Sequence, residues 1–192
     1  MRRLAGWAVL AGLLATAAVA GGAGDDEWVQ DSRDAAKQLG ATLMGELTAA
    51  LQTSPVEAID VCKLRAPGIA AELGEQAGAR IGRTALRVRN PANAPTDWQR
   101  DVLESFAASL AAGADAASLE HVEVAETGGV TERRWMKPIM TAPLCLTCHG
   151  GQIPAGIAQA LSVAYPEDQA TGFEAGQLRG AFYVVWRESA PK

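Results

Sequence analysis

Helical patterns come first along this chain and strand patterns follow, and this order limits the folds that it can adopt. Apolar residues recur at three- and four-residue spacing from Asp25 to about Leu51, which predicts an amphipathic helix. The run Ser54-Pro55-Val56-Glu57 combines a serine N-cap, a proline at the first helical position and a glutamate at the third, which predicts the start of a second helix. We expect Pro67 to kink this helix or to end its first part.

Alternating patterns predict most of the remaining structure as strands. They predict strands at 80–89, 120–126, 130–139 and 179–187. A capping box from Thr96 to Gln99 predicts one more helix, which ends near Gly113. Helices that precede strands joined by turns predict an α+β domain, with an antiparallel sheet flanked by helices and N-terminal helices before the sheet.

The first twenty residues have the pattern of an export signal. Met1-Arg2-Arg3 is positively charged, residues 4–19 are uncharged and mostly apolar, and Ala18-Val19-Ala20 supplies the small residues of a cleavage site. The apolar stretch is shorter than the roughly 20 residues of a membrane-spanning helix, which favours a cleaved signal peptide over a retained anchor. We therefore expect residues 1–20 to be a signal peptide and residues 21–192 to be one exported domain, periplasmic in a bacterium, with no transmembrane segment after cleavage.

The composition agrees with one globular domain and argues against nucleic acid as a partner. The 192 residues are 48% hydrophobic and 20% charged, as in folded proteins. Acidic residues outnumber basic ones by 22 to 17, for a net charge of -5. Binding to phosphates requires a basic stripe, which this composition lacks.

Two cysteines and a histidine form the most informative motif of the chain. Cys145-Leu146-Thr147-Cys148-His149 is a C-x-x-C-H run, the attachment signature of c-type haem. We expect one covalent haem per chain, with thioether bonds to Cys145 and Cys148 and with His149 as the proximal iron ligand. A thioredoxin-like redox pair is disfavoured because no βαβ unit surrounds the motif. A zinc site that includes Cys62 is disfavoured because the chain has no second metal-binding pair.

The residue patterns leave the sixth iron ligand open. The candidates are Cys62, His121, Met44, Met136 and Met140. Imidazole is a common haem ligand, but His121 falls on the polar face of a predicted strand. An unpaired cysteine is an oxidation hazard in an exported protein, and ligation of Cys62 to iron would protect it. Methionines more often fill the core.

Short motifs between Val29 and Trp186 resemble a known family. They are Cys62, Ala66-Pro67-x-Ile69-Ala70, Gly82-Arg83-Thr84, Arg89-Asn90-Pro91-x-Asn93-x-Pro95-x-Asp97-Trp98, Cys145-x-x-Cys148-His149-Gly150, Tyr165-Pro166-x-Asp168-x-Ala170-x-Gly172-Phe173-x-x-Gly176 and Arg179-Gly180. Together they resemble the PAS-like single-haem c-type domains, a family of haem-binding domains of unknown function. The resemblance implies a PAS-like fold, a covalent c-type haem and axial ligation by the histidine of the motif and a cysteine from an N-terminal helix. That cysteine is Cys62 here, so the resemblance favours Cys62 over His121. Ala85 and Gln99 depart from the family pattern, but neither is a proposed ligand.

Arginines of the predicted strand at 80–89 are candidates for the cofactor's carboxylates. Haem propionates are anionic, and Arg83, Arg87 and Arg89 would share one strand face. The alternative is a solvated basic face. Arg83 and Arg89 also lie in the family motifs, so we predict that these two residues contact the cofactor.

The expected function follows from the axial ligands. A thiolate ligand stabilises ferric over ferrous iron, which predicts a low midpoint potential. Reduction would weaken the bond to Cys62, open a position for a diatomic gas and release the helix that carries this residue. We therefore expect a redox or diatomic-gas sensor with a redox or signalling protein as partner, and the alternative is a small low-potential electron-transfer protein. We do not expect an enzyme, because the bound Cys62 would occupy the sixth position.

Overall fold

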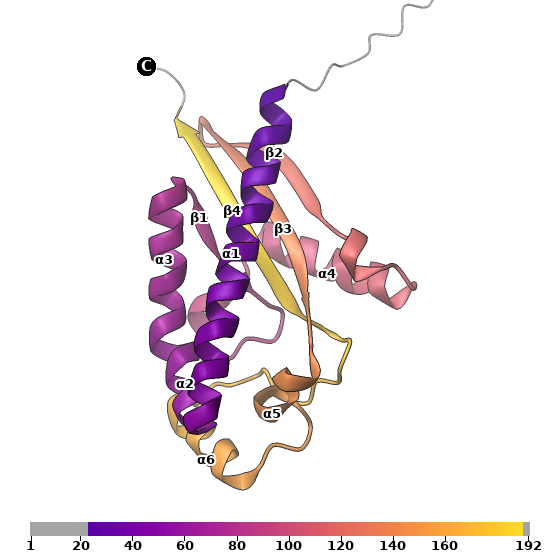
Figure 1. Ribbon diagram of the computed structural model, residues 1–192. Coiled ribbons are helices and arrows are strands. Elements are labelled where there is room, and N and C mark those ends of the chain that lie inside the picture. Colours follow the sequence, from indigo (N-terminus) through magenta and orange to yellow (C-terminus); the bar gives the residue numbers. More distant parts are fainter. Residues whose placement is uncertain (1–22, 190–192) are drawn as a thin grey trace, which may run out of the picture.

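The computed structural model describes residues 23–189, and a four-stranded antiparallel sheet lies at its centre (Figure 1). The strands follow the order β1-β4-β3-β2 across the sheet. Their bounds are β1 Arg80–Thr84, β2 His121–Thr127, β3 Val130–Met140 and β4 Leu178–Ser189. The predicted α+β class, with its PAS-like sheet and preceding helix, is confirmed. The predicted signal peptide at 1–20 lies outside the described residues.

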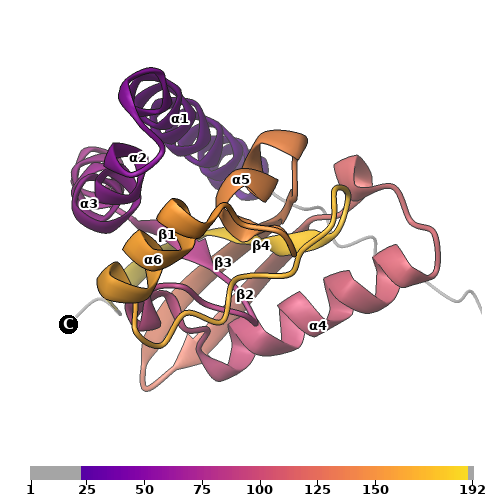
Figure 2. The same cartoon turned by 90° about the horizontal axis from the view of Figure 1, so that it is seen from below.

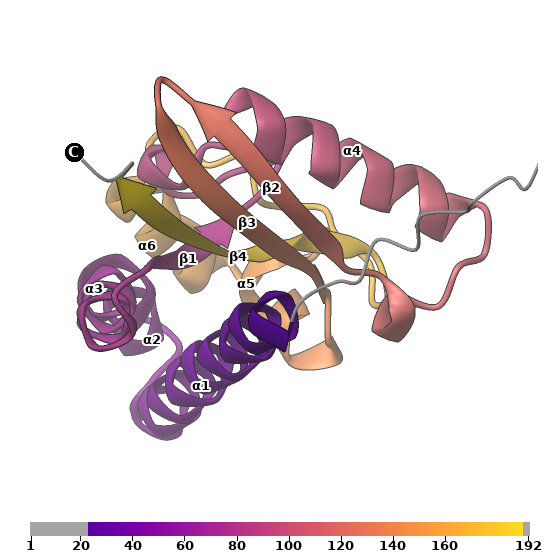
Figure 3. The same cartoon turned by 90° about the horizontal axis from the view of Figure 1, so that it is seen from above.

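Two long helices cover one face of the sheet. Helix α1 (Ala23–Thr53) and helix α3 (Ala66–Ala77) lie side by side on this face (Figures 2 and 3). Their apolar residues pack with sheet residues in one buried cluster, which includes Leu39, Ile69, Trp135 and Val184. Within the described residues, no helix combines the length and the apolarity that crossing a membrane requires.

A single helix covers the opposite face. Helix α4 (Asp97–Ala111) begins with the predicted capping box, since the side chains of Thr96 and Gln99 each bond the other's backbone. Leu103 and Phe106 of this helix are buried with Met136 of β3 in a second cluster. The sheet is therefore the middle layer of three.

A change of helix type separates the second predicted helix into parts. Ser54 caps it as expected, because its Oγ accepts the Glu57 amide at 3.1 Å. Helix α2 (Glu57–Asp60) passes into a π-helical turn, Val61–Arg65, and α3 follows with Pro67 in its first turn. Proline needs no amide partner at that position, so Pro67 fits the start of α3.

Short elements close one end of the sheet. Helices α5 (Leu146–His149) and α6 (Ala155–Ala164) lie below the sheet in Figure 1, close to α2. Ile59 packs there against Ile157, Leu161 and Tyr165 in a third buried cluster. Single 3-10 turns occupy Pro91–Asn93, Ala116–Ser118 and Pro143–Cys145.

The first strand is shorter than predicted. β1 ends at Thr84, which pairs with Ala181, although β4 itself extends three residues further to Leu178. The chain then leaves the sheet, and the Val88 carbonyl accepts a hydrogen bond from the Gln169 amide instead. The predicted strand at 80–89 was therefore wrong in its second half, and Arg87 and Arg89 do not share a strand face with Arg83.

Candidate functional site

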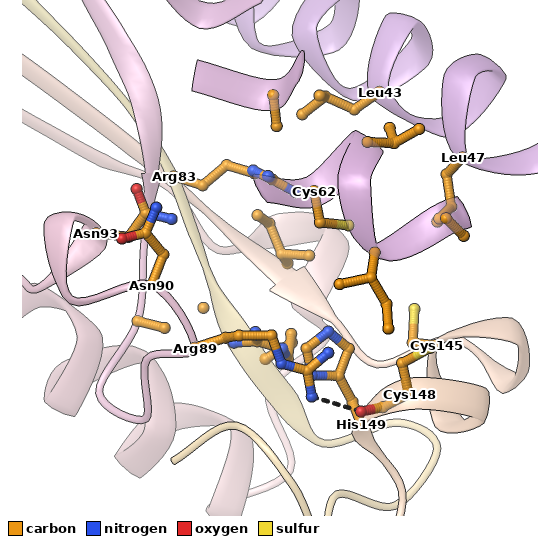
Figure 4. A pocket seen from close by; sticks show the side chains of 18 of the residues that line it. Leu43, Leu47, Cys62, Arg83, Arg89, Asn90, Asn93, Cys145, Cys148 and His149 are labelled. Atoms are coloured by element: carbon orange, nitrogen blue, oxygen red, sulfur yellow. Dashed lines mark hydrogen bonds between the residues drawn. The ribbon is translucent and has the colours of Figure 1, made fainter. Parts of the chain in front are cut away.

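A cavity opens between the α1 and α2 helices and the lower end of the sheet. It holds about 1420 Å³, counted out to its open mouth. Figure 4 shows Cys145, Cys148 and His149 at one side of it, with Cys62 and aliphatic residues of α1 at another. All six residues that the sequence predicted to bind the cofactor line this cavity, namely Cys62, Arg83, Arg89, Cys145, Cys148 and His149. The structure thus brings together all six residues from four separate segments.

One turn of helix places the two motif cysteines and the histidine together. Residues three and four apart are neighbours on a helix surface, and Cys145 precedes Cys148 and His149 by these intervals across α5. All three line the cavity. Burial raises the pKa of the Cys148 thiol, and the nearby Arg89 charge opposes this effect. The short helix therefore explains why this spacing brings two thiols and one imidazole to the same cavity.

The ring of His149 is held in one tautomer. Its Nδ1 donates a hydrogen bond to the Ala170 carbonyl oxygen at 2.7 Å, which leaves the Nε2 lone pair available for a metal. Burial, together with the positive charges of Arg179 and Arg89, lowers the pKa of His149 to about 3. The rings of His149 and Phe173 also form a T-shaped pair, with 6.4 Å between their centroids. A neutral imidazole in a fixed orientation is the form that binds iron.

Cys62 reaches the same cavity from the π-helical turn. Its side chain points into the cavity that His149 enters from α5 (Figure 4). Single π turns inside helices frequently mark functional positions, because the wider turn shifts one side chain relative to its neighbours. Burial and the nearby Cys62 thiol raise the pKa of Tyr165 to about 12.

Of the other candidate sixth ligands, only one lines the cavity. His121 lies on β2, stacked on Trp98 with 6.3 Å between ring centroids, and is absent from the cavity wall. Met136 is fully buried against α4, and Met140 does not line the cavity. Met44 of α1 does line it. Cys62 and Met44 are therefore the candidates that the structure brings to His149.

A bare metal site finds no support in this region. Across residues 23–189, no group of three or more histidine, cysteine, aspartate or glutamate side chains is arranged to hold a metal ion.

Arg89 is bonded to the protein on the cavity wall. Its Nε donates to Asp168 Oδ2 at 2.9 Å, and its Nη2 donates to the carbonyl oxygens of Cys148 and Ala170. Asp168 also accepts the Ala170 amide at 2.8 Å, so this aspartate caps the turn in which it lies. Arg89 thus ties the C-x-x-C-H segment to the loop that follows α6. Contact with a cofactor carboxylate stays a prediction for this residue.

Sequence reasoning missed Arg179 as a lining residue. It lies near the start of β4, lines the cavity, and places its guanidinium 5.2 Å from the centroid of the Phe173 ring. The motif Arg179-Gly180 was visible in the sequence, but its strand pattern gave no sign of which face Arg179 would occupy at the strand's first residues.

Comparisons with known proteins match this chain to a family and to a solved fold. The family model described as Tll0287-like matches residues 25–186. A solved structure described as the crystal structure of the cyanobacterial heme-protein Tll0287 matches with a TM-score of 0.65 and 23% identity, over 86% of this chain and 98% of that chain. No curated protein matches significantly. The family match covers most of the sequence and supports the resemblance found in the motifs, and the chain therefore belongs to the Tll0287-like family.

Proposed function

We propose that this chain is an exported protein with one covalent c-type haem, and that it senses redox state or a diatomic gas. Cys145 and Cys148 would hold the haem by thioether bonds, and His149 and Cys62 would be its axial ligands. The observation that carries the proposal is the meeting of these four residues in one cavity. The description of the related Tll0287 as a heme-protein supports it.

The residues of the cavity fit such a cofactor. Leu43 and Leu47 of α1, with Ile59 and Leu161, give the wall an aliphatic surface suited to a porphyrin face. His149 presents Nε2 because its Nδ1 is bonded to a carbonyl oxygen. Two thiols lie one helical turn apart beside it, as two thioether bonds along one porphyrin edge require.

When bound, the haem would supply an iron that exchanges one electron and can accept a diatomic ligand at a vacated position. The protein's own contribution lies in Cys62. This residue joins α2 to α3 through the π-helical turn, and both helices pack against α1. Binding of the Cys62 side chain to iron, or its release, would therefore affect α2 and α3 and, through their contacts, α1. This connection favours a sensor over a plain electron-transfer protein.

We further propose a binding role without catalysis, in an exported compartment, with a redox or signalling protein as the partner. A bound Cys62 would fill the position that an enzyme of this kind keeps open for its substrate. The Cys-x-x-Cys-His motif supports export, because haem is attached to such motifs after translocation.

The test is a set of ferric and ferrous absorption and EPR spectra of the exported protein and three variants. We expect Cys62→Ser to abolish a low-spin ferric thiolate signal. Met44→Leu and His121→Gln are the matched controls, and both should keep the signal. A parent spectrum without the thiolate signal, whose low-spin ferric bands change in Met44→Leu but not in Cys62→Ser, would make Met44 the ligand and would favour the electron-transfer alternative. A preparation without a c-type spectrum would refute the haem proposal itself.

A further inference from the structure

Three guanidinium groups line the cavity without an acidic residue among them. Arg83 comes from β1, Arg89 from the loop after it and Arg179 from β4, and the wall that they share contains no aspartate or glutamate. Their charges act on one another, because burial and the charges of Arg89 and Arg83 together lower the pKa of Arg179 to about 10. Charges gathered in a partly buried space are unfavourable unless an anion compensates them.

One of these three arginines, Arg89, already has an anionic partner within the protein. Arg89 pairs with Asp168, and both side chains are about nine-tenths buried, with exposed fractions of 9% and 11%. Its Nη2 is bonded to the Cys148 and Ala170 carbonyl oxygens. The Asp168 carboxylate is also satisfied, since its other oxygen accepts the Ala170 amide. The charges of Arg89 and Asp168 therefore compensate each other, and the hydrogen bonds of both side chains are made within the protein.

The other two arginines lack a carboxylate partner. The side chain of Arg83 makes no hydrogen bond or ion pair with any described residue. Burial lowers the pKa of Arg83, and the nearby Cys62 and Tyr165 only partly offset this. The hydrogen bond of Arg179 is long, 3.4 Å to the Arg87 carbonyl oxygen, and its guanidinium otherwise stacks on Phe173. Two guanidinium groups at one cavity thus have unused donors.

We propose that Arg83 and Arg179 bind the two haem carboxylates, and that Arg89 instead fixes the segment that carries His149. This inference rests on the proposed function and changes the assignment made from the sequence, which paired Arg83 with Arg89. Each guanidinium offers planar donors that match a carboxylate, and each bond would be charge-assisted. The cofactor has two carboxylates, and the cavity has two uncompensated arginines.

The place of Arg179 also connects the carboxylates to the iron ligand. Arg179 and His149 both lie against the same aromatic side chain, Phe173. The Phe173 amide donates to the His149 carbonyl oxygen at 2.9 Å. A carboxylate held by Arg179 would therefore be packed against the residue that orients His149.

Resonance Raman spectroscopy of the propionate bending bands tests the assignment in the exported holoprotein. The variants are Arg83→Gln, Arg179→Gln and Arg89→Gln, with the exposed Arg100→Gln on α4 as the control. We expect a shifted propionate band in Arg83→Gln and Arg179→Gln, with thermal unfolding close to that of the parent. Arg83→Lys and Arg179→Lys should restore part of the band position, because the charge returns without the planar donors.

Arg89→Gln should show the opposite pattern. We expect an unchanged propionate band but a lower unfolding temperature and an altered iron–histidine signal, since the Ala170 carbonyl that holds His149 loses its support. A shifted band in Arg89→Gln, together with unshifted bands in Arg83→Gln and Arg179→Gln, would overturn the inference while the proposed function stood. Absence of a c-type spectrum in the parent protein would overturn both.

Discussion

The Nδ1 of His149 and the carbonyl oxygen of Ala170 are joined by a hydrogen bond of 2.7 Å. Ala170 is itself fixed twice, because its amide donates to Asp168 and its carbonyl oxygen also accepts Arg89 at 3.2 Å. The ion pair of Arg89 and Asp168 therefore sets the orientation of the imidazole through one backbone unit. A histidine that must present Nε2 to iron gains a fixed ring plane from this support.

Asp168→Ala should destabilise the protein strongly. It removes the carboxylate from a largely buried pair and leaves Arg89 uncompensated, which costs about 3 kcal/mol or more in free energy of unfolding. Urea unfolding of the variant and of the parent measures the difference. Asp101→Ala, at an exposed position of α4, is the control and should change the free energy by less than about 0.5 kcal/mol. Equal losses in the two variants would show that the Arg89–Asp168 pair does not hold this loop.

The sequence predicted the elements that carry local signals. Capping residues marked the starts of α4 and of the helix after Ser54, and glycines marked the hairpin between β2 and β3. The C-x-x-C-H spacing also acts within one helical turn, so its three residues were found correctly as one cluster on the cavity wall. These features depend on neighbours within about four residues, which a sequence displays directly.

Features that depend on distant partners could not be predicted in the same way. The last residue of β1, Thr84, pairs with Ala181, almost one hundred positions later in the chain. The roles of the arginines depend on Asp168, which lies 79 residues from Arg89 along the chain. The π-helical turn at Cys62 has no sequence signature either, although the family resemblance identified this residue. Tertiary context therefore decides which guanidinium remains available to a cofactor.

Gly82→Ala should destabilise the sheet beside the cavity. A Cβ at position 82 would lie 2.6 Å from the Tyr183 hydroxyl and 2.7 Å from its ring carbon, so the ring on the neighbouring strand must move. Overpacking of this kind costs about 1–3 kcal/mol in free energy of unfolding.

Gly45→Ala is the matched substitution, because nothing lies within 4 Å of its Cβ and the position is an exposed turn of α1. This variant should gain about 0.5–1 kcal/mol, since alanine favours helix over glycine. The two substitutions should therefore shift urea unfolding midpoints in opposite directions, and a Gly82→Ala midpoint equal to that of the parent would contradict the close approach of Tyr183.

Glu132 should make the stability of the protein depend on acid pH. The hydrogen bonds from Arg134 and Arg187 hold the pKa of this buried carboxyl below its ordinary value of 4.5, despite the opposing effect of burial. The unfolded chain therefore binds a proton at a higher pH than the folded protein does. The stabilisation is complete above the unfolded pKa and is lost as pH falls through the folded pKa.

Glu132→Gln removes this titration. We expect the variant to lose about 2 kcal/mol of stability at pH 7, because hydrogen bonds to a charged group are replaced by neutral ones. Its stability should then fall less steeply than that of the parent between about pH 5 and pH 3. Urea unfolding at a series of pH values measures both effects, with Glu104→Gln on the exposed side of α4 as the control. Parallel curves for the Glu132→Gln variant and the parent would refute the role of this carboxylate.

Reduction of the haem should loosen the helices around Cys62. Cys62 lies in the π-helical turn between α2 and α3, so release of its side chain removes a restraint on residues 57–77. Hydrogen exchange followed by mass spectrometry should show amide exchange in this segment rising several-fold, by about 3-fold or more, in the reduced protein. Helix α4 lies on the opposite face of the sheet and should exchange at the same rate in both redox states (Figure 2). In Cys62→Ser, where no thiolate bond can break, residues 57–77 should exchange equally in both states. Unchanged exchange in the parent on reduction would argue for an electron-transfer protein, because a carrier keeps its ligands and its helices in place in both redox states.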